Sequence, residues 1–137
     1  MNDRAPLIFE DGNQMRDFVS ARDIARACVL ALEATNVDGE VFNVGSGEAR
    51  TVREIASRMA RTLGMEHLQP EITNKYRVGD IRHCFADLTR IREALGYQPR
   101  VTLDEGLKEL AQWLAGQPAE DRVAQASAEL SARGLTV

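Results

Sequence analysis

The sequence predicts an α/β fold, and three observations lead to that class. Segments with the apolar pattern of strands alternate with amphipathic helices along the whole of the 137 residues. Capping boxes mark two helix starts, at Thr51 and at Thr102. An apolar stretch at 41–44 is typical of a strand inside a parallel sheet. Together they predict one small mixed α/β unit, with a helical tail at 118–137 after a body at 1–117.

The composition excludes several kinds of protein. The net charge is -4, and the 17 basic residues are scattered among 21 acidic ones, so no basic patch for nucleic acid is predicted. The longest apolar run, 27–32, is much too short to cross a membrane. Cys28 and Cys84 stand in apolar contexts without metal-ligand spacing. We therefore expect a cytoplasmic protein whose cysteines are reduced packing residues.

The first half of the chain predicts strand, helix, strand. A short, buried apolar strand is predicted at 6–9 and ends at the turn signal Asp11-Gly12. Ser20 is an N-cap for a helix that extends to about Leu32, and this helix is apolar almost all round, which predicts burial on more than one face. The strand at 41–44 then leads to a glycine turn.

The second half predicts further alternation. Glycines or prolines end most of its elements. Its last helix is polar and rich in alanine, so we expect that helix to pack loosely or against a partner. The expected elements are a helix from Thr51 to Gly64, an edge strand at 70–73, a strand at 81–86, a helix capped by Asp87 and closed by Gly96, a helix at 102–115 and the tail helix at 119–133.

The glycine turn Gly45-Ser46-Gly47 lies between a strand and a helix, where such turns can hold phosphate groups. Ala49 and Arg50 occupy the place of the third glycine of a dinucleotide fingerprint, which favours a structural turn. Hence no residue of this chain is predicted to bind a cofactor.

Catalytic and metal-binding groups are not predicted either. A tyrosine with a lysine four residues later would suit acid–base catalysis, but Asp80 follows Tyr76 and Val101 follows Tyr97 at that distance. The two histidines have no carboxylate or cysteine at ligand spacing.

Two arginines remain as candidates for binding. Arg16 and Arg77 are expected on separate loops, each near a glycine that lets backbone approach a ligand, and two guanidinium groups could clamp a pyrophosphate. From the residues alone, solvated surface arginines are the commoner interpretation. Asp17 and Asp80 are interpreted first as partners of neighbouring backbone and second as ligand contacts.

Five motifs in order resemble a known family. They are Gly-x-x-x-Arg-Asp-Phe-Val-x-x-x-Asp, Val-Phe-Asn-Val-Gly-Ser-Gly, Arg-x-Gly-Asp, Leu-Gly-Tyr-x-Pro and a helix that contains a tryptophan. From about Pro6 to Trp113, the chain resembles the C-terminal, substrate-binding half of extended short-chain dehydrogenase/reductases. These are the NAD-dependent nucleotide-sugar epimerases and dehydratases, among them UDP-glucose 4-epimerase.

The resemblance implies a role for each matched residue. Arg16 and Arg77 are expected to bind the pyrophosphate of a nucleoside-diphosphate sugar, and Asp80 a ribose hydroxyl. Leu7 and Phe9 are expected to receive the nucleobase. Asp17, Phe18 and Asp23 are implied to be fixed points of the fold.

The resemblance also implies what this chain lacks, namely the N-terminal Rossmann half with the NAD site and the catalytic tyrosine. NAD is expected on that half, so the chain would be a fragment that is inactive alone and binds a Rossmann half or copies of itself through apolar surface at 21–32 and 41–44. A non-catalytic nucleotide-sugar-binding module and a protein-interaction module are the alternatives. The sugar, the base and the reaction stay open.

Overall fold

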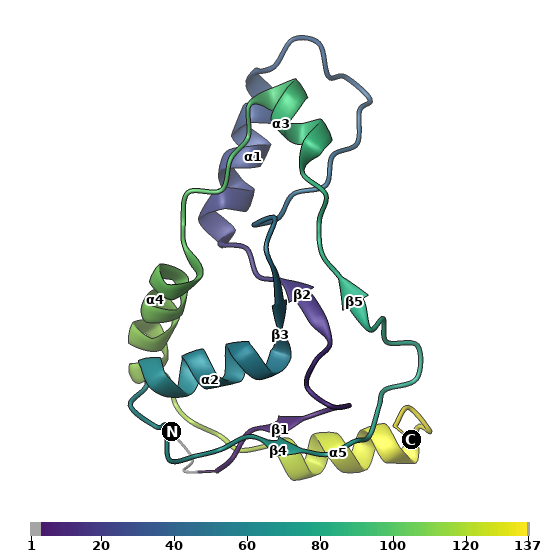
Figure 1. Cartoon of the computed structure of the whole chain (residues 1–137), viewed down its shortest axis with the longest axis vertical. Coiled ribbons are helices and arrows are strands. Elements are labelled where there is room, and N and C mark those ends of the chain that lie inside the picture. Colours follow the sequence, from purple (N-terminus) through teal and green to yellow (C-terminus); the bar gives the residue numbers. More distant parts are fainter. Residues whose placement is uncertain (1–3, 137) are drawn as a thin grey trace.

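The computed structural model describes residues 4–136, which form helices and short strands in an elongated arrangement (Figure 1). The strands are β1 (Leu7–Ile8), β2 (Met15–Asp17), β3 (Ala49–Thr51), β4 (Glu71–Ile72) and β5 (His83–Cys84). The helices are α1 (Ala21–Glu33), α2 (Val52–Thr62), α3 (Thr89–Leu95), α4 (Leu103–Ala115) and α5 (Val123–Ala132). The predicted α/β class is confirmed.

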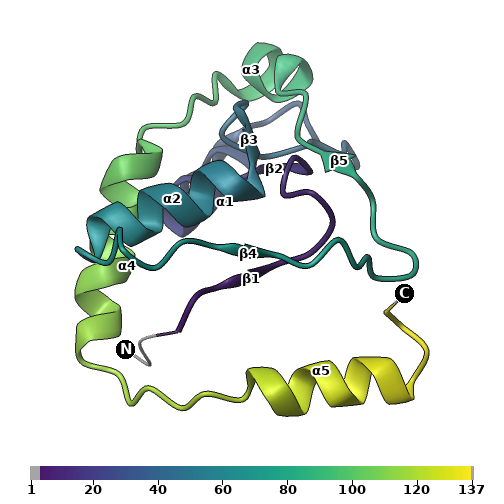
Figure 2. The same ribbon diagram turned by 60° about the horizontal axis from the view of Figure 1, so that its bottom comes forward.

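The strands form two small sheets. In the first, β1 pairs with β4 in parallel, with Ile8 beside Ile72. In the second, β2 is central, antiparallel to β3 and parallel to β5. Helices α1 and α3 lie together at one end of the molecule, whereas β1, β4 and α5 lie at the other end (Figures 1 and 2). Strand β2 therefore connects the two ends through the middle of the molecule.

The predicted strand at 41–44 is wrong. This segment forms no ladder with another strand in the part of the chain that the structure describes. Its Phe42 and Val44 side chains pack instead against the buried core between α1 and α3, which includes Ile91 and Tyr97. The apolar pattern thus marks burial, but a strand also needs a neighbour that can accept its hydrogen bonds.

Burial of α1 on more than one face is also wrong. Only Asp23 and Ala27 of this helix are buried, and Leu32 is 86 % exposed. The apolar contexts of Cys28 and Cys84 misled in the same way, since both thiols are free and exposed. For α1 the reason is that α3 and the segment 42–44 pack on one side of the helix and leave the other side open.

The predicted helix caps are largely confirmed. The Ser20 hydroxyl accepts from the Arg22 amide, and the Thr102 capping box has both of its hydrogen bonds. At Thr51 only one bond of the capping box forms, from the Glu54 amide to the Thr51 hydroxyl, because the Glu54 carboxylate pairs with Arg50 and Arg58. The tail helix begins later than predicted, because Asp121 accepts from the Val123 amide in a turn before α5. No helix within residues 4–136 is both long and apolar enough to cross a bilayer.

Candidate functional site

Arg16 and Arg77 converge on one carboxylate. Arg16 Nη2 lies 2.9 Å from Asp80 Oδ1, and Arg77 Nη2 lies 2.9 Å from Asp80 Oδ2. Arg16 is in the middle of β2 rather than on the predicted loop, and its Nη1 donates to the backbone oxygens of Met15 and Arg82. The strand thus fixes one guanidinium, while the Val78-Gly79 turn brings the second one to the same place.

Arg16 and Arg77 share the single carboxylate of Asp80. Burial tends to raise the pKa of Asp80, but the hydrogen bond from Arg77 and the charges of Arg77 and Arg16 outweigh it and lower that pKa. The carboxylate is therefore ionised at neutral pH, and two guanidinium groups face one negative charge. The Arg77 side chain is 54 % exposed and Arg16 26 %, so an anion from solvent can reach the pair.

An open depression of about 440 Å³ adjoins Arg77 and Asp80. Arg82 also lines this depression, and it pairs with Glu10 at 2.7 Å and with Asp11 at 2.8 Å. The hydrogen bond from Arg82 is the main reason that the pKa of Asp11 lies well below its usual range. The three arginines of this region are therefore matched by three carboxylates, and Arg16 and Arg77 are the two that share a single one.

The predicted nucleobase residues lie next to this cluster. Arg77 Cζ lies 5.6 Å from the centroid of the Phe9 ring, within the range of a cation–π contact. Leu7 and Phe9 line a separate cavity beside α5, and Leu7 is 42 % exposed there rather than buried in the strand as predicted. The ring of Phe9 therefore connects the arginine pair with an apolar cavity.

Sequence reasoning missed two residues of this region. Gln14 is buried and donates to the Phe9 backbone oxygen at 2.9 Å, which holds the end of β1. Arg82 ties the turn after β1 to the strand β5 region. Arg82 could have been found from its place two residues after Asp80, but nothing in the local pattern marks Gln14 as buried.

Asp17 explains the glycine turn. Its carboxylate accepts from the Ser46 amide at 2.7 Å, the Ser46 hydroxyl at 2.6 Å and the Gly47 amide at 3.1 Å. The structural interpretation of the turn is thus confirmed. These amides and the Ser46 hydroxyl hold Asp17 of β2 in place, which gives the turn a role in the fold of this chain.

Gly45→Ala should destabilise the protein by about 2 kcal/mol, because an added methyl overpacks this turn. A Cβ at Gly45 would lie 2.3 Å from Asp17 Oδ2 and 2.8 Å from Ala86 Cβ. Gly106→Ala in α4 is the control, since its Cβ would meet nothing within 4 Å. It should stabilise the helix by about 0.5–1 kcal/mol. Urea unfolding measures the free energy of unfolding of both variants. A Gly45→Ala protein as stable as the unmodified chain would contradict the packing described.

Tyr97 serves the fold. It is fully buried, and its hydroxyl donates to the Gly45 backbone oxygen at 3.0 Å. Burial, followed by the charge of Asp23, raises its pKa, which is opposite to what a tyrosine base requires. Within residues 4–136, no three His, Cys, Asp or Glu residues gather where they could hold a metal ion.

A second group of arginines lies on another face. Arg50, Arg58 and Arg100 line a hollow of about 320 Å³ near α2 and the start of α4. Arg50 pairs with Glu48 and Glu54, and Arg58 pairs with Glu54 and Asp104. Carboxylates of this chain thus pair with Arg50 and Arg58, as they do with the arginines around Asp80, and the motifs of the sequence point to Arg16 and Arg77 rather than to this hollow.

Comparison with known proteins matches the chain to nucleotide-sugar enzymes. Residues 1–110 match the family model described as GDP-mannose 4,6 dehydratase. The chain is 36% identical over 108 residues to dTDP-L-rhamnose 4-epimerase of Burkholderia thailandensis, covering 79% of this chain and 29% of that protein.

Solved structures of nucleotide-sugar enzymes also match the chain. UDP-glucose 4-epimerase from Thermotoga maritima with UDP-glucose matches with a TM-score of 0.74 and 35% identity, over 81% of this chain and 35% of that one. UDP-glucuronic acid 4-epimerase from Bacillus cereus, in complex with UDP-4-deoxy-4-fluoro-glucuronic acid and NAD, matches with a TM-score of 0.74 and 31% identity, over 82% and 36%.

The chain spans about a third of the length of these relatives. The part it matches contains the β2 arginine, the Asp17 turn and the Arg77–Asp80 loop. Sequence and fold thus agree with the resemblance drawn from the motifs. The chain belongs to the family of NAD-dependent nucleotide-sugar epimerases and dehydratases within the extended short-chain dehydrogenase/reductases.

Proposed function

We propose that the chain is the part of such an enzyme that binds the nucleoside diphosphate of a sugar nucleotide. One observation carries this proposal: guanidinium groups 61 positions apart in the sequence, from Arg16 to Arg77, each lie 2.9 Å from the same carboxylate. A carboxylate and a phosphate both present paired anionic oxygens, so Asp80 marks a place where a diphosphate would fit.

A diphosphate has the charge to displace Asp80. It carries more negative charge than one carboxylate, and both arginines could donate to it from their present positions. Asp80 would then be free to accept from a ribose hydroxyl. Leu7 and Phe9 would lie toward the base, since Phe9 already contacts Arg77. The relatives, whose names include UDP and dTDP sugars, support this class of ligand.

Hydride transfer would depend on other residues. The glycine turn at 45–47 lacks the third glycine of a dinucleotide fingerprint and holds Asp17, and neither tyrosine of the chain has a lysine four residues later. We therefore propose that residues outside these 137 supply NAD and the catalytic base, and that this chain alone does not turn over substrate.

The exposed apolar residues favour a second function, which is docking of a protein surface. Val29 is 49 % exposed, Leu32 86 % and Val41 75 %, all around α1 and the segment that follows it. A NAD-binding portion is the partner we propose for this surface. If the ligand site proves inactive, the same surface would make the chain a protein-interaction module.

Isothermal titration of the chain with UDP and UMP tests the proposed function. UDP should bind with one site per chain and at least about tenfold more tightly than UMP, because UMP offers a single phosphate to two arginines. Equal affinities for UDP and UMP would contradict the proposal. A chain that binds neither nucleotide would favour the interaction module.

A further inference from the structure

The C-terminal segment faces the proposed nucleobase residues across a hollow. Helix α5 lies at the same end of the molecule as β1 and β4, and Figure 2 shows it apart from these strands. Asp121, just before the helix, pairs with Arg4 ahead of β1 at 2.7 Å. After the helix, the Val78 amide donates to the Leu135 backbone oxygen at 3.0 Å. The helix is thus tied to the chain at both of its ends.

The second tie reaches the arginine site itself. Arg77 forms an antiparallel bridge with Thr136, so the residue that pairs with Asp80 also holds the end of the chain. The Arg77 guanidinium in turn lies over the Phe9 ring. Residues that follow α5 therefore touch the same loop that is proposed to bind the diphosphate.

A cavity of about 880 Å³ lies between β1 and α5. Leu7 and Phe9 line one side of it, and Val123, Ala126 and Leu130 line the other. This volume is within the range of pockets that bind small molecules, and its walls are mostly apolar, as a nucleobase requires. The cavity is separate from the depression at Arg77 and Asp80, but the Phe9 ring that lines it also lies 5.6 Å from Arg77 Cζ, so one ring stands between the two hollows.

We propose that α5 forms the second wall of the nucleobase pocket, so that the base binds between β1 and this helix. The inference rests on the proposed function, and it adds a wall from residues that follow the matched range 1–110. The base would lie on the Phe9 side and contact Ala126 and Leu130 on the other. Without α5, one face of the bound base would stay in water.

The test is a tryptophan at one of two neighbouring positions of α5 in the full chain. Both alanines are exposed, but Ala126 lines the cavity, whereas Ala128, two residues later and on the opposite side of the helix from Ala126, does not. Ala126→Trp should weaken UDP binding about tenfold and leave the affinity for inorganic pyrophosphate unchanged. Ala128→Trp should change neither affinity.

Hydrogen exchange of the unmodified chain provides a second measurement. UDP should slow exchange of the α5 amides at 123–132, and pyrophosphate should not, because pyrophosphate has no base to contact the helix. Unchanged UDP affinity in Ala126→Trp, or equal α5 exchange with both ligands, overturns the inference and leaves the proposed function standing. Failure of the unmodified chain to bind UDP and pyrophosphate overturns both.

Discussion

Arg16→Ala and Arg77→Ala should each weaken UDP binding by about tenfold to a hundredfold. Each substitution removes one of the two guanidinium groups that converge on Asp80. A hydrogen bond to a charged group contributes about 1.5–3 kcal/mol, which is the origin of this range. Titration calorimetry at fixed salt measures the change, and the melting temperature of each variant shows whether it is folded.

Arg61→Ala is the matched control for these variants. Its side chain is 76% exposed at the end of α2, and its Nε lies 3.5 Å from one Glu66 oxygen. UDP affinity should stay within about twofold of the unmodified chain, since exposed ion pairs contribute little. If the Arg16 and Arg77 variants bind UDP as tightly as this control, the diphosphate does not lie between them and the interaction module becomes the better account.

Asp23→Ala should lower the free energy of unfolding by about 3 kcal/mol, and the melting temperature by roughly 10 °C. The Asp23 side chain is almost fully buried and accepts from the Arg100 amide at 3.0 Å and the Val101 amide at 3.0 Å. It also pairs with Arg26 at 3.0 Å. Removal of the carboxylate leaves these donors without an acceptor and frees the segment that leads into α4.

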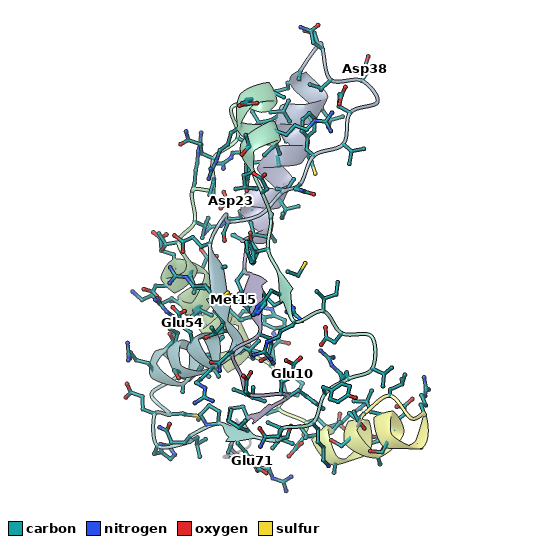
Figure 3. The ribbon with its side chains drawn as sticks, turned by 45° about the vertical axis from the view of Figure 1, so that its right-hand side comes forward. Glu10, Met15, Asp23, Asp38, Glu54 and Glu71 are labelled. Atoms are coloured by element: carbon teal, nitrogen blue, oxygen red, sulfur yellow. The ribbon has the colours of Figure 1, made fainter. Side chains whose placement is uncertain are left out.

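Asp38→Ala tests whether the loss belongs to burial rather than to any aspartate near α1. Asp38 lies on the exposed loop beyond the end of the helix, whereas Asp23 lies near its start (Figure 3). Its replacement should change stability by no more than about 0.5 kcal/mol. Thermal unfolding followed by circular dichroism compares the two variants, and equal melting temperatures would show that the Asp23 contacts do not hold α1 to the α4 segment.

Local signals predicted the helices well. Ser20, Thr51 and Thr102 each accept a backbone hydrogen bond at the expected helix start, and Gly96 closes α3 with a left-handed φ of 62°. These signals succeed because a cap involves only residues within one turn of it. The local residue pattern was therefore sufficient to predict where most helices begin and end.

Burial and strand pairing were less predictable, because both depend on distant neighbours. The apolar segment 41–44 has the composition of a strand, yet its partners are core side chains of α1 and α3. Leu32 has the spacing of a core residue, and it is 86 % exposed since nothing in the described chain covers it. In both cases the residue type shows that the side chain can be buried, but it does not show which part of the chain lies beside it.

The candidate site was predicted through the ordered motifs rather than through any single pattern. Arg16 and Arg77 are ordinary surface arginines until the fold brings them to Asp80. The role of α5 beside Leu7 and Phe9 had no signal, because the contact joins the two ends of the chain. Assignment of these residues to the diphosphate and the base stays a prediction.

A crystal structure of the chain with UDP tests the central claim most directly. The account predicts diphosphate oxygens at about 2.7–3.2 Å from both the Arg16 and Arg77 guanidinium groups, with Asp80 displaced from between them. A diphosphate bound in the hollow of Arg50, Arg58 and Arg100, with both arginine pairs to Asp80 intact, would contradict it.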